Sequence, residues 1–245
     1  MQLKPAWKRL FRNAATLAAL LSVLFIAMRA AGTLGPQELR WTLPLGFLLM
    51  IALPWIILTA EGRRRIGLRR CEQPAFFLVA VFTGLVAACI CYALGIILFG
   101  HGSDNWFASI ANSYRSTLDT RGMDILTLYL VFTLPALLFS PIGEEIFFRG
   151  FLQDALQEVF SARTSALTGA GLFGAVHLFH HGLIATAGGI AVRPLSGAIW
   201  VALMFSTALL FAWLRRTSGS LFPAMIAHAS FNATMNALIF ATLWN

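Results

Sequence analysis

The sequence predicts an all-α fold, a polytopic transmembrane helix bundle of seven or eight spans. Of its 245 residues, 58% are hydrophobic and only 11% are charged, whereas soluble domains carry about 25% charged residues. The mean hydropathy is +0.76. Apolar windows long enough to cross a bilayer recur along the whole chain. We therefore expect a single membrane domain, residues 1–245, that crosses the inner membrane of a bacterial cell several times.

Seven apolar windows define the predicted spans, in chain order. They cover residues 14–31, 42–60, 75–99, 124–146, 164–181, 196–214 and 219–242. The first window follows several basic residues, as in a signal peptide, but further spans follow at once, so we interpret it as a retained helix. The fourth is expected to continue as an amphipathic helix to Glu158. The glycine-containing segment 182–195 could form a loop, a re-entrant turn or a short additional helix.

Basic residues lie mainly on one side of this predicted bundle. If the spans alternate in direction, one side holds Lys4, Lys8, Arg9, Arg12, Arg63, Arg64, Arg65, Arg69, Arg70, Arg163, Arg215 and Arg216. The other side holds Arg40, Arg115, Arg121 and Arg193. Cytoplasmic loops carry the excess of positive charge, which places the N-terminus in the cytoplasm. No basic face with interleaved aromatic residues is present, so we expect the lipid bilayer as a partner and no nucleic acid.

Two adjacent acidic residues, Glu144 and Glu145, interrupt the fourth apolar window. An acidic residue at the centre of a membrane helix costs about 2.5–3.5 kcal/mol, so a buried polar site is expected here. Glu145 and Arg149 are four residues apart on one helical face and are predicted to pair. Adjacent residues of an α-helix differ by about 100°. We therefore expect the two carboxylates to point to different centres and Glu144 to be the free one.

Polar residues on two later spans are predicted to lie at the depth of Glu144. Counted from the cytoplasmic helix ends, Glu144, His177 and His228 are all about 12–18 Å deep. Asn232 is four residues after His228 and shares its face. Glu144 can act as a general base, His177 can orient a water, and His228 with Asn232 can donate hydrogen bonds to one oxyanion. This set favours direct attack by water on an amide.

Other interpretations of the same residues stay open. Buried ion pairs and histidines in membrane bundles often only join helices, so a proton-coupled transporter or a non-catalytic adaptor or immunity protein is the alternative. We expect no metal cofactor. Zinc is the alternative, held by Glu144, His177 and His228, since two histidines and a glutamate form a known catalytic zinc site. His177, His180 and His181 also share one helical face that could bind a metal.

Three short motifs carry a family resemblance. Residues 144–149 read EEIFFR, an EExxxR motif; residues 173–177 read FGAVH, an FxxxH motif; and residues 228–232 read HASFN, an HxxxN motif. In this order, and each in an apolar helix, they resemble the CPBP family of intramembrane proteases. That family includes Rce1-type CAAX prenyl endopeptidases and bacterial abortive infection proteins. The resemblance covers about residues 125–240, the expected catalytic core.

The resemblance implies a glutamic intramembrane endopeptidase. Glu144 and His177 would activate water, and His228 and Asn232 would be the oxyanion donors. Supporting roles would fall to three further motif residues: Glu145, Arg149 and Phe173. The implied substrate is a membrane protein or peptide, lipidated or otherwise associated with the membrane. The family also implies a conical cavity that opens towards the cytoplasm and the lipid.

Overall fold

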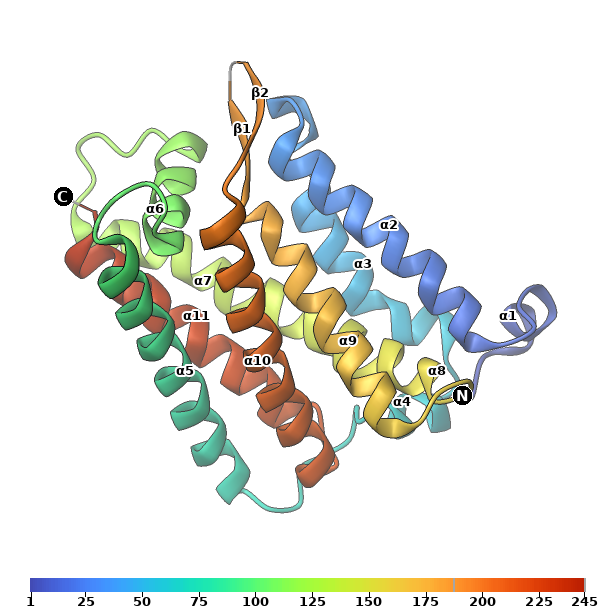
Figure 1. Cartoon of the computed structure of the whole chain (residues 1–245). Coiled ribbons are helices and arrows are strands. Elements are labelled where there is room, and N and C mark those ends of the chain that lie inside the picture. The colour runs from blue at the N-terminus through green and yellow to red at the C-terminus, as the bar shows by residue number, and fades with distance from the viewer. Residues whose placement is uncertain (187, 245) are drawn as a thin grey trace.

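The structure is a computed structural model that describes residues 1–186 and 188–244. Long helices run between the two ends of the molecule (Figure 1). They are α2 (Ala14–Leu34), α3 (Thr42–Ile57), α5 (Ala75–Phe99), α7 (Ile125–Glu144), α9 (Ala162–Val176), α10 (Pro194–Ser218) and α11 (Phe222–Thr242). Each corresponds to one predicted apolar window. The all-α membrane bundle is therefore confirmed.

The fourth predicted span is longer than its apolar window, as expected. α7 continues without a break into a π-helix, η2 (Glu145–Leu152), and then into α8 (Gln153–Leu156). The whole stretch Ile125–Leu156 is one of five helices that are long and apolar enough to cross a membrane. The others are Ala14–Leu34, Gln37–Ile57, Ala75–Phe99 and Pro194–Ser218. α9 is shorter, with 15 residues, and the polar residues of α11 lower its hydropathy.

Short elements connect the long helices. They are α1 (Pro5–Leu10), η1 (Gln37–Leu39), α4 (Ala60–Arg65), α6 (Trp106–Thr117) and the 3-10 turn η3 (His177–Phe179). α6 falls in a segment for which the apolar windows predicted no helix. Only one of its faces is apolar, and that face buries Trp106, Phe107 and Ile110. A one-sided helix of this length lacks the continuous apolar run that identifies a span.

The segment 182–195 is mainly a β-hairpin, so the three expected conformations for it were wrong. β1 (Leu183–Thr186) and β2 (Gly189–Val192) pair antiparallel, with Leu183 opposite Val192 and Thr186 opposite Gly189. Gly182 and Gly189 flank the strands with φ of +115° and +120°, a conformation that favours glycine. The hairpin projects from one end of the bundle (Figure 1) and adds no eighth helix among the described residues.

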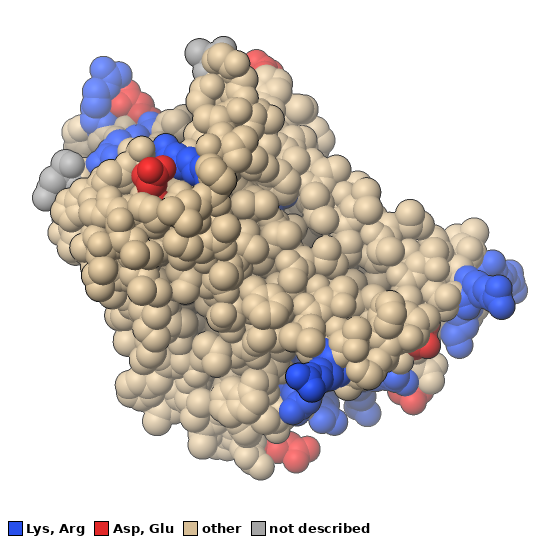
Figure 2. All heavy atoms as spheres, in the orientation of Figure 1, with Lys and Arg blue, Asp and Glu red and all other residues tan. Residues whose placement is uncertain are grey.

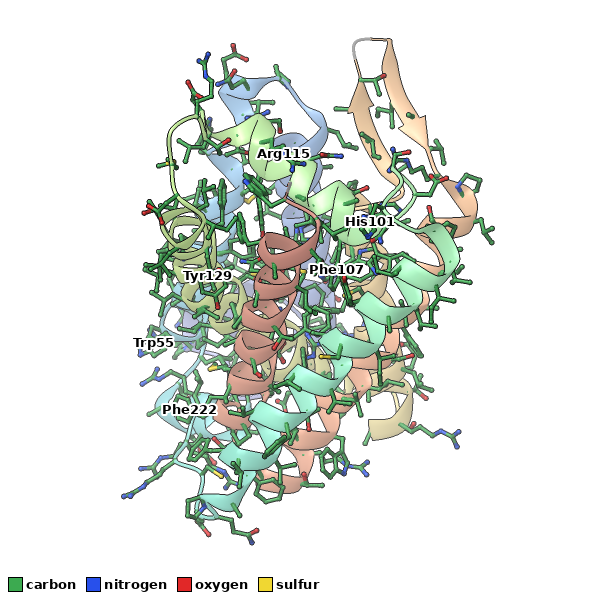
Figure 3. All side chains as sticks on the ribbon, turned by 90° about the vertical axis from the view of Figure 1, so that its left-hand side faces the viewer. Trp55, His101, Phe107, Arg115, Tyr129 and Phe222 are labelled. Carbon is green, nitrogen blue, oxygen red and sulfur yellow. The ribbon has the colours of Figure 1, made fainter. Side chains whose placement is uncertain are left out.

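The charged residues gather at the two ends, with a broad uncharged surface between them (Figure 2). α1, α4 and α8 lie at one end, and α6 and the hairpin lie at the other (Figure 1). Figure 3 shows Arg115 and His101 near the hairpin end and Phe222 nearer the opposite one. The twelve basic residues counted together above belong to the segments of the α1 end. The helix order therefore agrees with the sidedness that the charges predicted.

α5 and α11 pack closely because a glycine faces the other helix. A Cβ built on Gly84 would lie 2.0 Å from the carbonyl oxygen of Ala227 and 2.8 Å from the backbone nitrogen of Phe231. Real Cβ atoms do not approach this closely, so α11 is held against α5 at its backbone. α11 carries His228 and Asn232, and Gly84 thus sets the position of both.

We expect Gly84→Ala to lower the free energy of unfolding by about 1–3 kcal/mol, because the added methyl overpacks this contact. Gly171→Ala on α9 is the matched control, since a Cβ there meets nothing within 4 Å. Thermal unfolding of both variants in detergent measures the difference. Equal stability of the two variants would contradict the close packing of α5 and α11.

Candidate active site

A cluster of buried charged side chains joins α2, the α7–η2 junction and α11. Glu144 ends α7, Glu145 begins η2, and Arg149 lies one turn further along η2. The exposed fractions of these three residues are 1%, 0% and 1%, and that of Arg29 on α2 is 8%. Charged groups buried this far from water require partners at short distance. The contacts between these side chains therefore show which charges are paired.

Glu145 is held by two partners. Its Oε1 accepts a hydrogen bond from Nδ1 of His228 at 2.9 Å and lies 3.1 Å from Nη1 of Arg149. The Arg149 guanidinium lies over the ring of Phe173, 3.9 Å from its centroid. The predicted pairing of Glu145 with Arg149 is thus present, and Phe173 packs against it. A cation over an aromatic face is stabilised by the ring quadrupole.

Glu144 also has a cationic partner, so the expectation of a free carboxylate was wrong. Its Oε1 accepts a hydrogen bond from Nη2 of Arg29 at 2.7 Å. Its Oε2 has no hydrogen-bond partner and lies 3.8 Å from Nε2 of His228. The sequence contains a sign of this role, since Arg29 is the one charge within the first apolar window. An ionisable residue inside a membrane helix is by default a candidate for function.

The two carboxylates lie on either side of the same imidazole, which corrects the expectation of separate centres. His228 turns Nδ1 to Glu145 and Nε2 towards Glu144. A ring with nitrogens on two edges can approach two carboxylates that diverge from one helix. The change from α-helix to π-helix occurs between these two glutamates, and π-helical turns are frequent at functional sites.

His228 and Asn232 each have one donor already engaged. An ionised Glu145 can only accept, so Nδ1 of His228 carries a proton. Nδ2 of Asn232 donates to the carbonyl oxygen of Ala136 at 2.9 Å. The second N–H of the Asn232 amide is a donor that this residue can still offer to an oxyanion. His228 can donate from Nε2 only as an imidazolium, with a proton on each ring nitrogen. The joint action of both residues on one oxygen stays a prediction.

His177 has a defined tautomer. Its Nδ1 lies 2.6 Å from the carbonyl oxygen of Phe173, and because a carbonyl only accepts, Nδ1 is the donor. The neutral ring therefore keeps a lone pair on Nε2. That nitrogen can accept a hydrogen bond from a water molecule, as the predicted role of His177 requires.

A cavity of about 720 Å³ brings the predicted residues together. Its wall includes Phe173, His177, His228, Asn232 and Arg29. This volume lies within the usual range of small-ligand pockets. Glu144 is not on this wall; it borders a separate small void behind it. Arg29 borders both spaces and is bonded to Glu144, so it links the buried carboxylate to the cavity wall.

The cavity opens at the hairpin end of the bundle. Its rim includes Arg40, Ser113, Ala185 and Arg193, from η1, α6, β1 and the start of α10. The exposed Phe139 of α7 lies on its side wall, where it faces the lipid. The family resemblance implied an opening towards the cytoplasm. The basic residues gather at the opposite end of the bundle; which end faces the cytoplasm, and with it the expected opening, stays a prediction.

The histidines after α9 do not form a common metal-binding face. Both ring nitrogens of His181 are engaged, Nδ1 with Ser109 and Nε2 with Ser196, each at 2.8 Å. Among residues 1–186 and 188–244, no three histidine, cysteine or acidic side chains are arranged to hold a metal ion. A metal-free mechanism stays a prediction that only a metal-removal experiment can test.

Comparison with known families identifies the second half of the bundle. Residues 126–234 match the family described as type II CAAX prenyl endopeptidase Rce1-like. The chain thus resembles the Rce1-like family over 109 of its 245 residues. No match was found among curated proteins or among solved structures.

The match to the Rce1-like family supports a protease that acts on membrane proteins. This favours the peptidase hypothesis over the transporter and adaptor hypotheses. The matched segment contains the three motifs and all seven site residues that the sequence predicted. Arg29 lies outside it, on a helix that the family description does not cover.

Proposed function

We propose that this Rce1-like protein is a glutamic endopeptidase that hydrolyses a peptide bond of a membrane-associated or lipidated substrate. The observation that carries the proposal is the buried Glu144 carboxylate. Its Oε2 has no hydrogen-bond partner and lies beside His228, next to a cavity whose wall holds His177 and Asn232. The substrate enters this cavity from the lipid side or from the hairpin end.

In the proposed reaction, a water between Glu144 and His177 attacks the peptide carbonyl carbon. Glu144 takes one proton from the water while Nε2 of His177 accepts a hydrogen bond from it and orients it. The carbonyl oxygen becomes an oxyanion, to which Asn232 and the imidazolium form of His228 donate hydrogen bonds. When the carbon–nitrogen bond breaks, the proton held by Glu144 passes to the departing amine. The products are a carboxylic acid and an amine, and no covalent enzyme intermediate forms.

Glu145 is less suited to be the base. Its Oε2 has no hydrogen-bond partner, as for Glu144, but its Oε1 accepts from His228 and pairs with Arg149. Glu145 also borders neither the cavity nor the small void. Its contacts instead fix the imidazole of His228 and balance the Arg149 charge. We assign it, with Arg149 and Phe173, a supporting role.

We expect His177→Ala to lower the turnover number by about 10²–10⁴-fold, the usual contribution of a group that assists proton transfer. The measurement is cleavage of labelled membrane peptides by the purified protein in detergent, with and without a strong chelator. His101→Ala is the control, since His101 lies in an exposed loop. In the glutamic mechanism the chelator has little effect.

Three results would contradict parts of this proposal. Activity that the chelator abolishes and zinc restores would favour a metal held by Glu144, His177 and His228. Full activity of His177→Ala would exclude its role in activating water. A wild-type protein that cleaves nothing in a broad screen of membrane peptides would contradict the proposed function.

A further inference from the structure

The cavity wall is cationic. Its charged residues are Arg29, Arg40 and Arg193, and among the described residues no aspartate or glutamate lines it. A cavity with basic side chains and apolar walls concentrates ligands that carry a negative charge. Its occupant is therefore expected to be an apolar molecule with an anionic group.

Two of these arginines already have partners. Nη1 of Arg40 donates to the carbonyl oxygen of Ser116 at 3.0 Å. Arg193 lies 3.4 Å from Asp104 and donates to Oγ of Ser109 at 2.9 Å. Both arginines contribute positive charge to the cavity, but the donor atoms named here already have partners at its rim.

Arg29 differs because half of its guanidinium is free. Nη2 donates to Glu144, whereas Nη1 is buried and has no hydrogen-bond partner. The side chain is only 9% exposed. A buried donor without a partner is costly. Arg29 lines the cavity, so a turn of its guanidinium would bring Nη1 to an acceptor there. A guanidinium is a planar fork of donors that matches the two oxygens of a carboxylate.

We propose that Arg29 binds a carboxylate of the substrate and, in doing so, releases Glu144 to the cavity. This inference rests on the proposed function. In the absence of substrate, Arg29 is bonded to Glu144 and lines the cavity. A substrate carboxylate that takes the guanidinium replaces one ion pair of Arg29 by another, and the Glu144 carboxylate that is released keeps His228 as its neighbour. Oε1 of Glu144 is then free to turn to water at the cavity wall.

The carboxylate can come from the C-terminus of a peptide or from an acidic side chain near the scissile bond. Four versions of one N-terminally labelled apolar pentapeptide separate these sources. Two have no acidic side chain and end in a free acid or in an amide. Two end in an amide and carry either Glu or Gln at one internal position. Fluorescence anisotropy with the protein in detergent gives the dissociation constant of each.

We expect one carboxylate peptide to bind wild type about 10- to 100-fold more tightly than its neutral counterpart, the range for a charge-assisted hydrogen bond. Arg29→Gln should abolish this preference, and Arg29→Lys should restore part of it. Arg40→Gln is the matched control, since it removes a rim charge and should keep most of the preference. Glu144→Gln removes the competing carboxylate and should bind the acidic peptide more tightly than wild type.

Arg29→Gln alone leaves Glu144 without its partner and can unfold the protein. Glu144→Gln keeps an acceptor for Arg29, and the double variant Arg29→Gln/Glu144→Gln removes both charges, so neither leaves a buried carboxylate without its partner; thermal unfolding checks that both variants are folded. The two variants differ only at Arg29, so loss of the preference in the double variant alone assigns carboxylate binding to Arg29.

Several results would overturn the proposal. They are equal binding of the acidic and neutral peptides by wild type, an unchanged preference in the double variant, or weaker acidic-peptide binding by Glu144→Gln than by wild type. Binding does not depend on cleavage, so the two proposals fail separately. A preference that depends on Arg29, in a protein that cleaves nothing, would contradict only the proposed function.

Discussion

Glu144→Gln is expected to lower the turnover number for peptide hydrolysis by about 10²–10⁴-fold. Glutamine keeps the size of the side chain and can still accept a hydrogen bond from Arg29, but it cannot take a proton from water. A general base contributes about this factor to a reaction rate. The change removes one negative charge from a cluster of two carboxylates and two guanidinium groups, so folding must be checked alongside activity.

Initial rates with the cleaved peptide, together with thermal unfolding in detergent, test this expectation. Glu72→Gln is the matched control, because Glu72 is an exposed glutamate in the loop before α5. A folded Glu144→Gln variant that retains more than about a tenth of wild-type turnover would remove Glu144 from the role of base.

Glu145→Ala is expected to lower the free energy of unfolding by about 3–5 kcal/mol, the usual cost of leaving one partner of a buried ion pair uncompensated. Arg149 is 1% exposed, and its guanidinium has no hydrogen-bond partner apart from the ion pair with Glu145. The substitution also removes the acceptor of Nδ1 of His228. Unfolding midpoints in a fixed detergent measure the loss.

The double variant Glu145→Ala/Arg149→Met is the informative comparison. It removes both charges and places an apolar side chain against Phe173, so much of the lost stability should return. If the double variant is as unstable as the sum of the single variants, the two residues do not act as a pair. A loss below about 1 kcal/mol in Glu145→Ala would show that the pair contributes little to stability.

Local patterns in the sequence predicted the helices and part of the site. Each long apolar run formed a helix, because a chain in lipid must satisfy its backbone hydrogen bonds internally. The pairing of Glu145 with Arg149 followed from their spacing on one helix. The three motifs led to the family that residues 126–234 match.

Features that depend on distant contacts were not predicted. The partner of Glu144 comes from another helix, and spacing along α7 cannot reveal it. The α-to-π transition depends on packing around the junction, so an ideal 100° wheel misplaced the two carboxylates. The hairpin at residues 183–192 and the one-sided helix α6 lack the long apolar runs on which the span prediction relied.

Arg29 also links catalysis to the assembly of the protein in the membrane. It is synthesised 115 residues before Glu144, and an arginine in the centre of a membrane helix raises the free energy of insertion by about 2.5–3.5 kcal/mol. During translation, α2 therefore carries a charge whose carboxylate partner does not yet exist. The docking of α2 against η2 and α8 brings Arg29 to Glu144, neutralises that charge and also completes the environment of Glu144. Completion of the bundle and formation of the resting active site are thus the same event.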